Sequence, residues 1–213
     1  PLPIAPACEA LGIASRVEME AQVFQSAGCN WRCWYCYVPF EDLTGRRGAL
    51  VPVAEMASFA VEAGATLVDL TGGQPDLTPE WPVWMLKNLD LRGASSTFVW
   101  SDDNLSTDYL WRYLSAEDIE YLGSHRLYGR ACCLKGYDDS SFAFTTGAHP
   151  TLFDRQFELL TRLQQSTAIN YYLYVTFTGP PVSDMTETVS RFVDRLQGVS
   201  ETLPLRTIPL RLV

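Results

Sequence analysis

Residues 53–75, VAEMASFAVEAGATLVDLTGGQP, contain in order a helix, a strand and a glycine-rich loop. Apolar residues recur at intervals of three and four over the first ten positions, and Pro52 and Gly64 are residue types that begin and end helices. Residues 66–70, TLVDL, then predict a short buried strand that runs into Gly72 and Gly73. A helix followed at once by a buried strand is typical of parallel α/β folds.

The same alternation continues along the chain. Strands are predicted near residues 18–24, 96–100, 130–134, 171–177 and 207–212, with helices near 81–89 and beginning near 107, 150 and 185. A polar loop is expected between the fourth strand and the helix at 150. About six βα units without hairpin signals fit an open doubly wound sheet or an incomplete parallel (β/α)6 barrel. In both folds, sites form where the carboxyl end of each strand meets the next helix.

Length and composition restrict the class of protein. A chain of 213 residues with 47% hydrophobic content predicts one domain over residues 1–213. The chain begins with Pro1 rather than Met, so we expect that the native protein can extend past either end. No apolar stretch is long enough for a membrane span, which predicts a soluble, cytoplasmic protein. The net charge of −9 disfavours nucleic acid as a partner.

Cys29, Cys33 and Cys36 follow the spacing C-x3-C-x2-C, which is short enough for one loop to direct three thiolates at a single 4Fe-4S cubane. With no fourth cysteine nearby, one iron keeps an open position that a chelating small molecule can take. A structural zinc site is the chemical alternative. It would need a fourth ligand, and the two histidines, His125 and His149, lie on distant segments.

The cysteine loop, with the aromatic Tyr35 before its last cysteine, resembles the signature of the radical S-adenosylmethionine (SAM) superfamily. The resemblance implies a 4Fe-4S cluster ligated by the three cysteines, with SAM on the open iron as the source of a 5′-deoxyadenosyl radical. Residues 72–75, Gly-Gly-Gln-Pro, resemble the Gly-Gly-Glu type of motif that holds the SAM amine in that family. Gln74 stands where the family usually has glutamate, and Pro75 follows it.

Polar residues near the other predicted strand ends extend the candidate SAM site. Side chains after the third strand can accept hydrogen bonds from ribose hydroxyls or cap the next helix. The closest resemblance is to the glycyl-radical-enzyme activating enzymes, such as the pyruvate formate-lyase activating enzyme, and it implies a SAM contact from the fourth strand end. Cys133 replaces the acidic residue of their Asp-x-Lys pattern, and Cys132 and Cys133 can equally be core residues. The candidate SAM contacts beyond the cysteine and glycine loops are Ser101, Asp103, Asn104, Lys135, Thr176 and Arg211.

Taken together, the sequence predicts an enzyme that cleaves SAM reductively and starts radical chemistry on another molecule. A short, laterally open barrel would admit a protein or peptide substrate, with glycyl radical installation as the family precedent. An electron donor such as flavodoxin or ferredoxin is the implied partner. A radical SAM enzyme for a small metabolite is one alternative, and a non-catalytic iron-sulfur electron-transfer or zinc-binding protein is another. No residue is predicted to act on the substrate.

Overall fold

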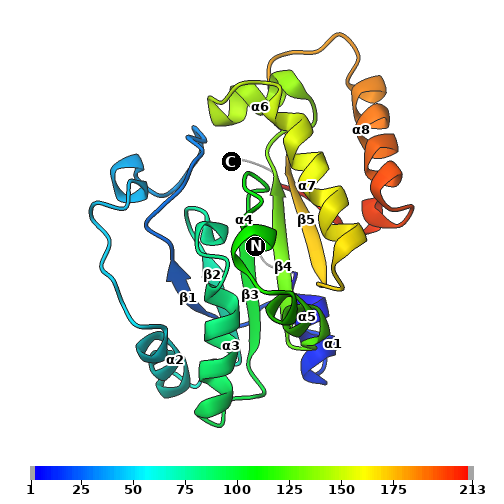
Figure 1. Ribbon diagram of the computed structural model, residues 1–213. Coiled ribbons are helices and arrows are strands. Elements are labelled where there is room, and N and C mark those ends of the chain that lie inside the picture. Colours follow the sequence, from blue (N-terminus) through cyan, green and yellow to red (C-terminus); the bar gives the residue numbers. More distant parts are fainter. Residues whose placement is uncertain (1–2, 211–213) are drawn as a thin grey trace.

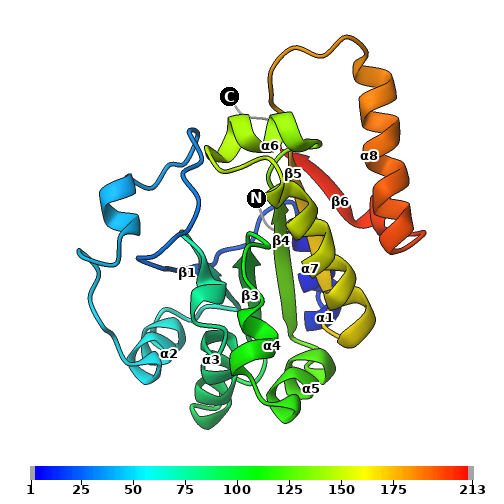
Figure 2. The ribbon, with the colours of Figure 1, turned by 45° about the horizontal axis from the view of Figure 1, so that its top comes forward.

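A computed structural model describes residues 3–210 and contains a six-stranded sheet. All neighbouring strands are parallel, in the order β1-β2-β3-β4-β5-β6. Within the described residues β1 and β6 are the two edges, so the curved sheet remains open between them (Figures 1 and 2). The strands are β1 (Gln22–Gln25), β2 (Leu67–Thr71), β3 (Phe98–Asp103), β4 (Tyr128–Leu134), β5 (Tyr171–Thr176) and β6 (Thr207–Leu210).

Helices connect successive strands and cover the outer face of the sheet (Figure 1). The predicted helix at residue 53 is present as α2, and Gly64 just after it adopts a φ of 65°. No helix within residues 3–210 has both the length and the apolar character that a membrane span requires. The helices are α1 (Ile4–Leu11), α2 (Val53–Glu62), α3 (Trp81–Leu91), α4 (Tyr109–Tyr113), α5 (Ala116–Ser124), α6 (Asp139–Thr146), α7 (Leu152–Ser166) and α8 (Met185–Val199), with short 3-10 turns η1 (Phe40–Leu43), η2 (Pro75–Leu77) and η3 (Leu203–Arg206).

The segment expected to be a polar loop after the fourth strand contains the helix α6, so that prediction was wrong. A reciprocal capping box begins this helix: the Ser141 amide donates to Asp138 Oδ1 at 2.7 Å, and the Asp138 amide donates to Ser141 Oγ at 2.9 Å. Phe142, Thr145 and Thr146 are buried within it. Its sequence, DSSFAFTT, has no clear helical periodicity, because polar residues occupy part of its buried face.

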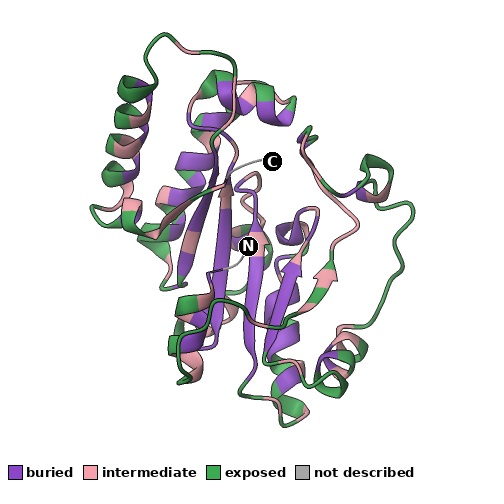
Figure 3. Cartoon of the chain, turned by 180° about the vertical axis from the view of Figure 1, so that it is seen from behind, coloured by how far each residue is buried: buried purple, intermediate pink, exposed green. Residues whose placement is uncertain are grey.

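Successive side chains along each strand point to opposite faces of the sheet. Val68, Leu70 and Val99 pack with the helices in the larger core. The intervening residues line the inner face, which Figure 3 shows from the side opposite to Figure 1. Near the amino ends of the strands this inner face is apolar and α1 closes it: Ala7, Leu67, Phe98, Trp100 and Leu127 form a separate core cluster. Toward the carboxyl ends the inner residues become polar.

Candidate active site

The cysteine loop lies beyond the carboxyl end of β1 and is fixed by backbone hydrogen bonds from two directions. The Cys29 amide donates to Leu43 O at 3.1 Å, within the loop itself. The Arg32 and Trp34 amides donate to carbonyl groups at the end of α6, Thr146 O and Thr145 O, both at 3.2 Å. The helix that sequence reasoning missed is therefore the element that holds the middle of the cysteine loop.

The three predicted cluster ligands are free thiols that line one cavity of about 140 Å³. Burial raises the pKa of Cys29 and of Cys33, and the nearby Lys135 ammonium opposes the shift at both thiols. A tetrahedral zinc ion needs sulfur ligands roughly 3.8 Å apart. Residues 3–210 contain no group of three or more His, Cys, Asp or Glu side chains gathered for a single metal ion. Three thiols on the wall of one cavity are the protein ligands that a 4Fe-4S cluster with one open iron would require, whereas a closed zinc site would need a fourth ligand.

The same cavity gathers most of the predicted SAM contacts. Tyr35, Gly72, Gly73, Gln74, Asn104 and Lys135 line it together with the three cysteines. Thr176 lies next to it, because its hydroxyl is 2.9 Å from the Tyr35 hydroxyl. The carboxyl ends of β2, β3, β4 and β5 thus converge on the cysteine loop, as expected for a parallel sheet.

Three other predicted contacts are not brought into the cavity, and a fourth cannot be placed. Ser101 lies within β3 on the helix side of the sheet, where its hydroxyl is 2.7 Å from that of Tyr128. Asp103 is the last residue of β3 and faces the same side, and Pro75 starts the buried turn η2. Arg211 lies outside the described residues.

The glycine loop has a backbone conformation that favours glycine. Gly72 and Gly73 have φ values of 62° and 64°. A Cβ on Gly73 would lie 2.3 Å from Gly28 O, the carbonyl group just before the first cysteine. Gly28 O also accepts a 2.7 Å hydrogen bond from the Gln74 amide. The two loops therefore touch through backbone atoms, and their approach leaves no space for a side chain at position 73.

Gln74 has a buried side chain whose two polar ends are both used inside the protein. Its Nε2 donates to Asp103 Oδ1 at 2.9 Å, and its Oε1 accepts from the Asn104 amide at 2.9 Å. The Asn104 side chain in turn donates to Cys29 Sγ at 3.7 Å and to Asn30 Oδ1 at 3.2 Å. Gln74 consequently positions Asn104, and Asn104 contacts the cysteine loop directly.

A buried ion network supports this arrangement from the helix side of the sheet. Arg130 of β4 pairs with Asp76 of η2, and its Nε donates to Asp103 Oδ2 at 3.2 Å. The three side chains are between 3% and 7% exposed. Burial raises the pKa of Asp76 to about 7, against the attraction of Arg130. The network ties the loops after β2 and β3 to β4, so it fixes the spacing of the strand ends that surround the cavity.

Sequence reasoning missed a set of polar residues on the inner face below the cavity. Asp69 lies in β2 beside Trp100 of β3, and Asp102, two residues further along β3, lines the cavity together with Thr71 and Cys133. Thr71 donates a hydrogen bond to Asp102 Oδ2. Burial raises the pKa of Asp102, opposed by this bond and by Lys135. The available signal was the aspartate inside TLVDL, because a charged residue in the middle of a buried strand needs an explanation.

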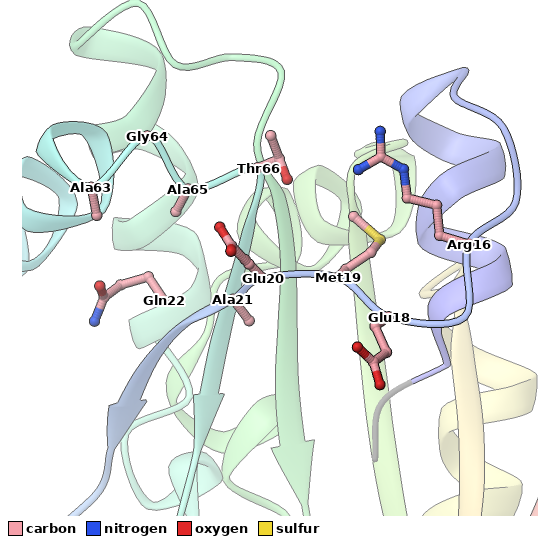
Figure 4. A pocket seen from close by; sticks show the side chains of 10 residues that line it. All are labelled: Arg16, Glu18, Met19, Glu20, Ala21, Gln22, Ala63, Gly64, Ala65 and Thr66. Atoms are coloured by element: carbon pink, nitrogen blue, oxygen red, sulfur yellow. The ribbon is translucent and has the colours of Figure 1, made fainter.

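A larger cavity of about 630 Å³ lies at the opposite end of the sheet (Figure 4). It is bounded by the segment from Arg16 to Gln22, which leads into β1, and by the segment from Ala63 to Thr66, which leads into β2. This is the amino end of the strands, away from the cysteines. Active sites of parallel α/β folds form at the carboxyl ends of the strands. The cavity at the cysteine loop is therefore the better candidate, although it is the smaller of the two.

Solved structures share the fold, whereas no protein-family model and no curated protein sequence matches the chain. SuiB from Streptococcus suis, bound to S-adenosylmethionine, has a TM-score of 0.59 and 16% identity over 85% of this chain and 38% of that chain. SuiB bound to precursor peptide SuiA has a TM-score of 0.55 and 14% identity over 90% of this chain and 39% of that chain. A radical SAM methyltransferase from Sphaerobacter thermophilus has a TM-score of only 0.38, with 16% identity over 89% of this chain and 65% of that chain.

These likenesses establish the fold. It is an open, incomplete parallel (β/α)6 barrel, as the sequence predicted. The chain spans about two fifths of the length of the SuiB chains that it matches.

Proposed function

We propose that this chain forms the catalytic core of a radical SAM enzyme. The observation that carries the proposal is the convergence, on one cavity at the strand ends, of three free thiols, a glycine loop, an asparagine and a lysine. A 4Fe-4S cluster with SAM on its open iron supplies, after reduction by one electron, a 5′-deoxyadenosyl radical that abstracts hydrogen from a substrate. The remaining requirements concern what the protein itself holds and excludes.

Each residue of the cavity has a role that follows from its contacts. Cys29, Cys33 and Cys36 would hold the cluster, and the Asn104 amide would orient the Cys29 thiolate through its hydrogen bond. Lys135 would pair with the SAM carboxylate. Its ammonium lies 5.8 Å from the centre of the Tyr35 ring, on the side of the cavity formed by β4.

The remaining cavity walls would bind the cofactor and keep out water. Gly72 and Gly73 expose backbone that the SAM amine can approach closely. Tyr35 is held in place by its hydrogen bond to Thr176. Trp31 is only 7% exposed and packs edge-on against Phe142 of α6, so it would shield a bound cluster from water.

We further propose a peptide or protein as the substrate. Within residues 3–210 the sheet does not close between β1 and β6, and SuiB, with the same fold, was crystallised with a precursor peptide. Glycyl radical installation is the special case in which the peptide belongs to a partner enzyme. A flavodoxin or ferredoxin would supply the electron.

The test is anaerobic reconstitution with iron and sulfide, followed by dithionite and SAM, with 5′-deoxyadenosine measured by chromatography. Wild-type protein should bind about four irons and form 5′-deoxyadenosine. Cys33→Ala should lose both the cluster absorbance and the product. Cys8→Ala, which changes a buried cysteine in α1 far from the cavity, is the matched control and should retain both. An intact cluster that leaves SAM uncleaved would contradict the proposal.

A further inference from the structure

The adjacent cysteines Cys132 and Cys133 of β4 point to opposite faces of the sheet. Cys132 is 0% exposed and belongs, with Leu134, to the larger core on the helix side. Because side chains alternate along a strand, Cys133 between them faces the inside of the barrel. It lines the cavity that also holds the three thiols of the cysteine loop. One cysteine of the pair is therefore a core residue, and the other is a fourth thiol in the candidate site.

The backbone around Cys133 is fixed by one buried side chain of α7. Gln156 is 0% exposed, and its Nε2 donates to Cys133 O at 3.1 Å and to Asn104 O at 2.7 Å. Its Oε1 accepts from the Lys135 amide at 3.1 Å. Gln156 thus holds the end of β4 against the loop that follows β3. The protein itself sets the position of Cys133 at the cavity wall.

The thiol group of Cys133, in contrast to its backbone, is held only weakly. Within residues 3–210 its one hydrogen bond goes to Ala131 O at 3.8 Å, and a thiol is a weak donor. The side chain is half-buried and forms no disulfide with another described cysteine. Rotation of this side chain would therefore break little, and the sulfur is available to a ligand in the cavity.

The end of β4 and the cysteine loop face each other across this small cavity. The Lys135 ammonium lies 5.8 Å from the centre of the ring of Tyr35, which stands between the second and third cysteines of the loop. Three thiolates from one loop would occupy three corners of a cubane, so the fourth iron would point away from the loop and toward the opposite wall. Among the described residues that line the cavity, Cys133 supplies the one sulfur outside the loop.

We propose that Cys133 is an exchangeable fourth ligand of the cluster, which binds the open iron when SAM is absent and leaves it when SAM binds. The bond between Cys133 Sγ and iron forms as the thiol releases its proton to solvent. When SAM takes that iron, the bond breaks, and the thiolate accepts the proton that the SAM ammonium group must release to chelate. No electron is transferred in either direction. Thiolate is the usual protein ligand of iron-sulfur clusters. The inference rests on the proposed function, because it names what occupies the SAM position before SAM arrives.

The first experiment measures whether the fourth iron is retained on oxidation, and it requires no turnover. Protein reconstituted anaerobically without SAM is treated with ferricyanide, which removes one electron from the cluster. A cluster whose fourth iron lacks a protein ligand then releases that iron as Fe²⁺ and becomes a 3Fe-4S cluster, which paramagnetic resonance detects. Wild-type protein should keep about four irons, and Cys133→Ala should fall to about three. If Cys133 binds iron in about nine tenths of the molecules, the 3Fe-4S signal of the variant is about tenfold larger.

Two further variants separate the thiol of Cys133 from its surroundings. Cys132→Ala is the matched control, because it removes the neighbouring thiol, which faces the helices, and it should retain iron as the wild type does. Cys133→Ser keeps the size of the side chain but offers an oxygen ligand, which suits a cluster iron less well than sulfur does. Its iron retention should lie between those of the wild type and Cys133→Ala. Circular dichroism establishes that each variant is folded.

The second experiment measures SAM binding to the reconstituted, unreduced protein by equilibrium dialysis. Only molecules whose fourth iron is open can bind SAM, so the apparent Kd of the wild type rises by the reciprocal of that fraction. With about one tenth of the molecules open, Cys133→Ala should bind SAM about tenfold more tightly than the wild type. Cys132→Ala should bind SAM as the wild type does.

The proposal is overturned by any of three results: equal iron loss from the wild type and Cys133→Ala, equal iron loss from Cys132→Ala and Cys133→Ala, or SAM binding that is no tighter in Cys133→Ala. These failures are distinct from failure of the proposed function. Wild-type protein that takes up no cluster would refute both. A cluster that is labile only in Cys133→Ala, with SAM bound but never cleaved, would remove the radical mechanism and leave Cys133 as a ligand. SAM cleavage by proteins whose clusters are equally labile would do the reverse.

Discussion

Replacing Arg130 with methionine is the most informative perturbation of the network behind the cavity. Arg130 is 3% exposed and is the shared partner of Asp76 and Asp103, which are 3% and 7% exposed. Methionine fills much of the same volume but removes the charge and every donor. Both carboxyl groups would then remain buried without a cation.

The expected loss of stability follows from this burial. Removing one partner from a buried ion pair costs about 3–5 kcal/mol, a large share of the roughly 5–15 kcal/mol of a typical domain. The cost depends on pH. Burial raises the pKa of Asp76 to about 7 even with Arg130 present, whereas the carboxyl ionises near 3.8 in the unfolded chain. A carboxyl with a raised folded-state pKa destabilises the fold above its unfolded pKa, and this cost vanishes as the pH falls toward that value. The penalty of Arg130→Met is therefore larger at pH 8 than at pH 5.

Urea denaturation, monitored by circular dichroism at pH 8 and pH 5, measures this loss of stability. Arg47→Met is the matched control, because Arg47 is 61% exposed and pairs with Glu41, which is 63% exposed. That variant should lose less than about 1 kcal/mol at either pH. The reasoning fails if Arg130→Met is as stable as the control at pH 8, or if its penalty grows on acidification.

Three further substitutions test other parts of the site. Gly73→Ala would place a Cβ 2.3 Å from a backbone oxygen at a φ of 64° and should cost about 2 kcal/mol more than Gly147→Ala, which has a similar φ but open space, in thermal unfolding. Gln74→Glu sets a carboxylate against Asp103 in a buried site and should cost about 2–4 kcal/mol at pH 8 and less at pH 5, by urea denaturation. Burial raises the pKa of Asp69 to about 8, so the stability of the wild-type protein falls between pH 4 and pH 8. Asp69→Asn should be more stable than wild type by about 1–3 kcal/mol at pH 8 and equally stable at pH 4. A melting temperature that is unchanged at pH 8 would contradict this expectation.

The sequence predicted the elements whose signals are local. The alternation of helices and buried strands gave the parallel barrel, and the thiol spacing located the cavity. The helix α6 was missed because it is stabilised by the Asp138–Ser141 capping box and by contacts with the cysteine loop, neither of which appears as apolar periodicity. Its position relative to that loop is tertiary information.

The length of one strand decided which acidic side chain enters the barrel. The third strand was predicted to end at residue 100, which placed Ser101 and Asp103 in a loop with free orientation. The strand continues to Asp103, so its alternation directs Asp102 inward and turns the other two toward the helices. Charged residues rarely occupy buried strands, and the partners that permit it here, Arg130 and Thr71, come from other strands.

The glutamine at position 74 is explained by the same strand. Its amide must donate to Asp103 on one side and accept from the Asn104 amide on the other, and a carboxylate can only accept. Glutamine at 74 and aspartate at 103 therefore depend on each other, and Arg130 neutralises the single carboxylate that the pair contains. Glutamine in place of the glutamate of the Gly-Gly-Glu pattern therefore changes the internal hydrogen bonds that support the site. Under the proposed function, Asn104 would take over the polar contact expected of residue 74, because it alone of these side chains reaches the cysteine loop.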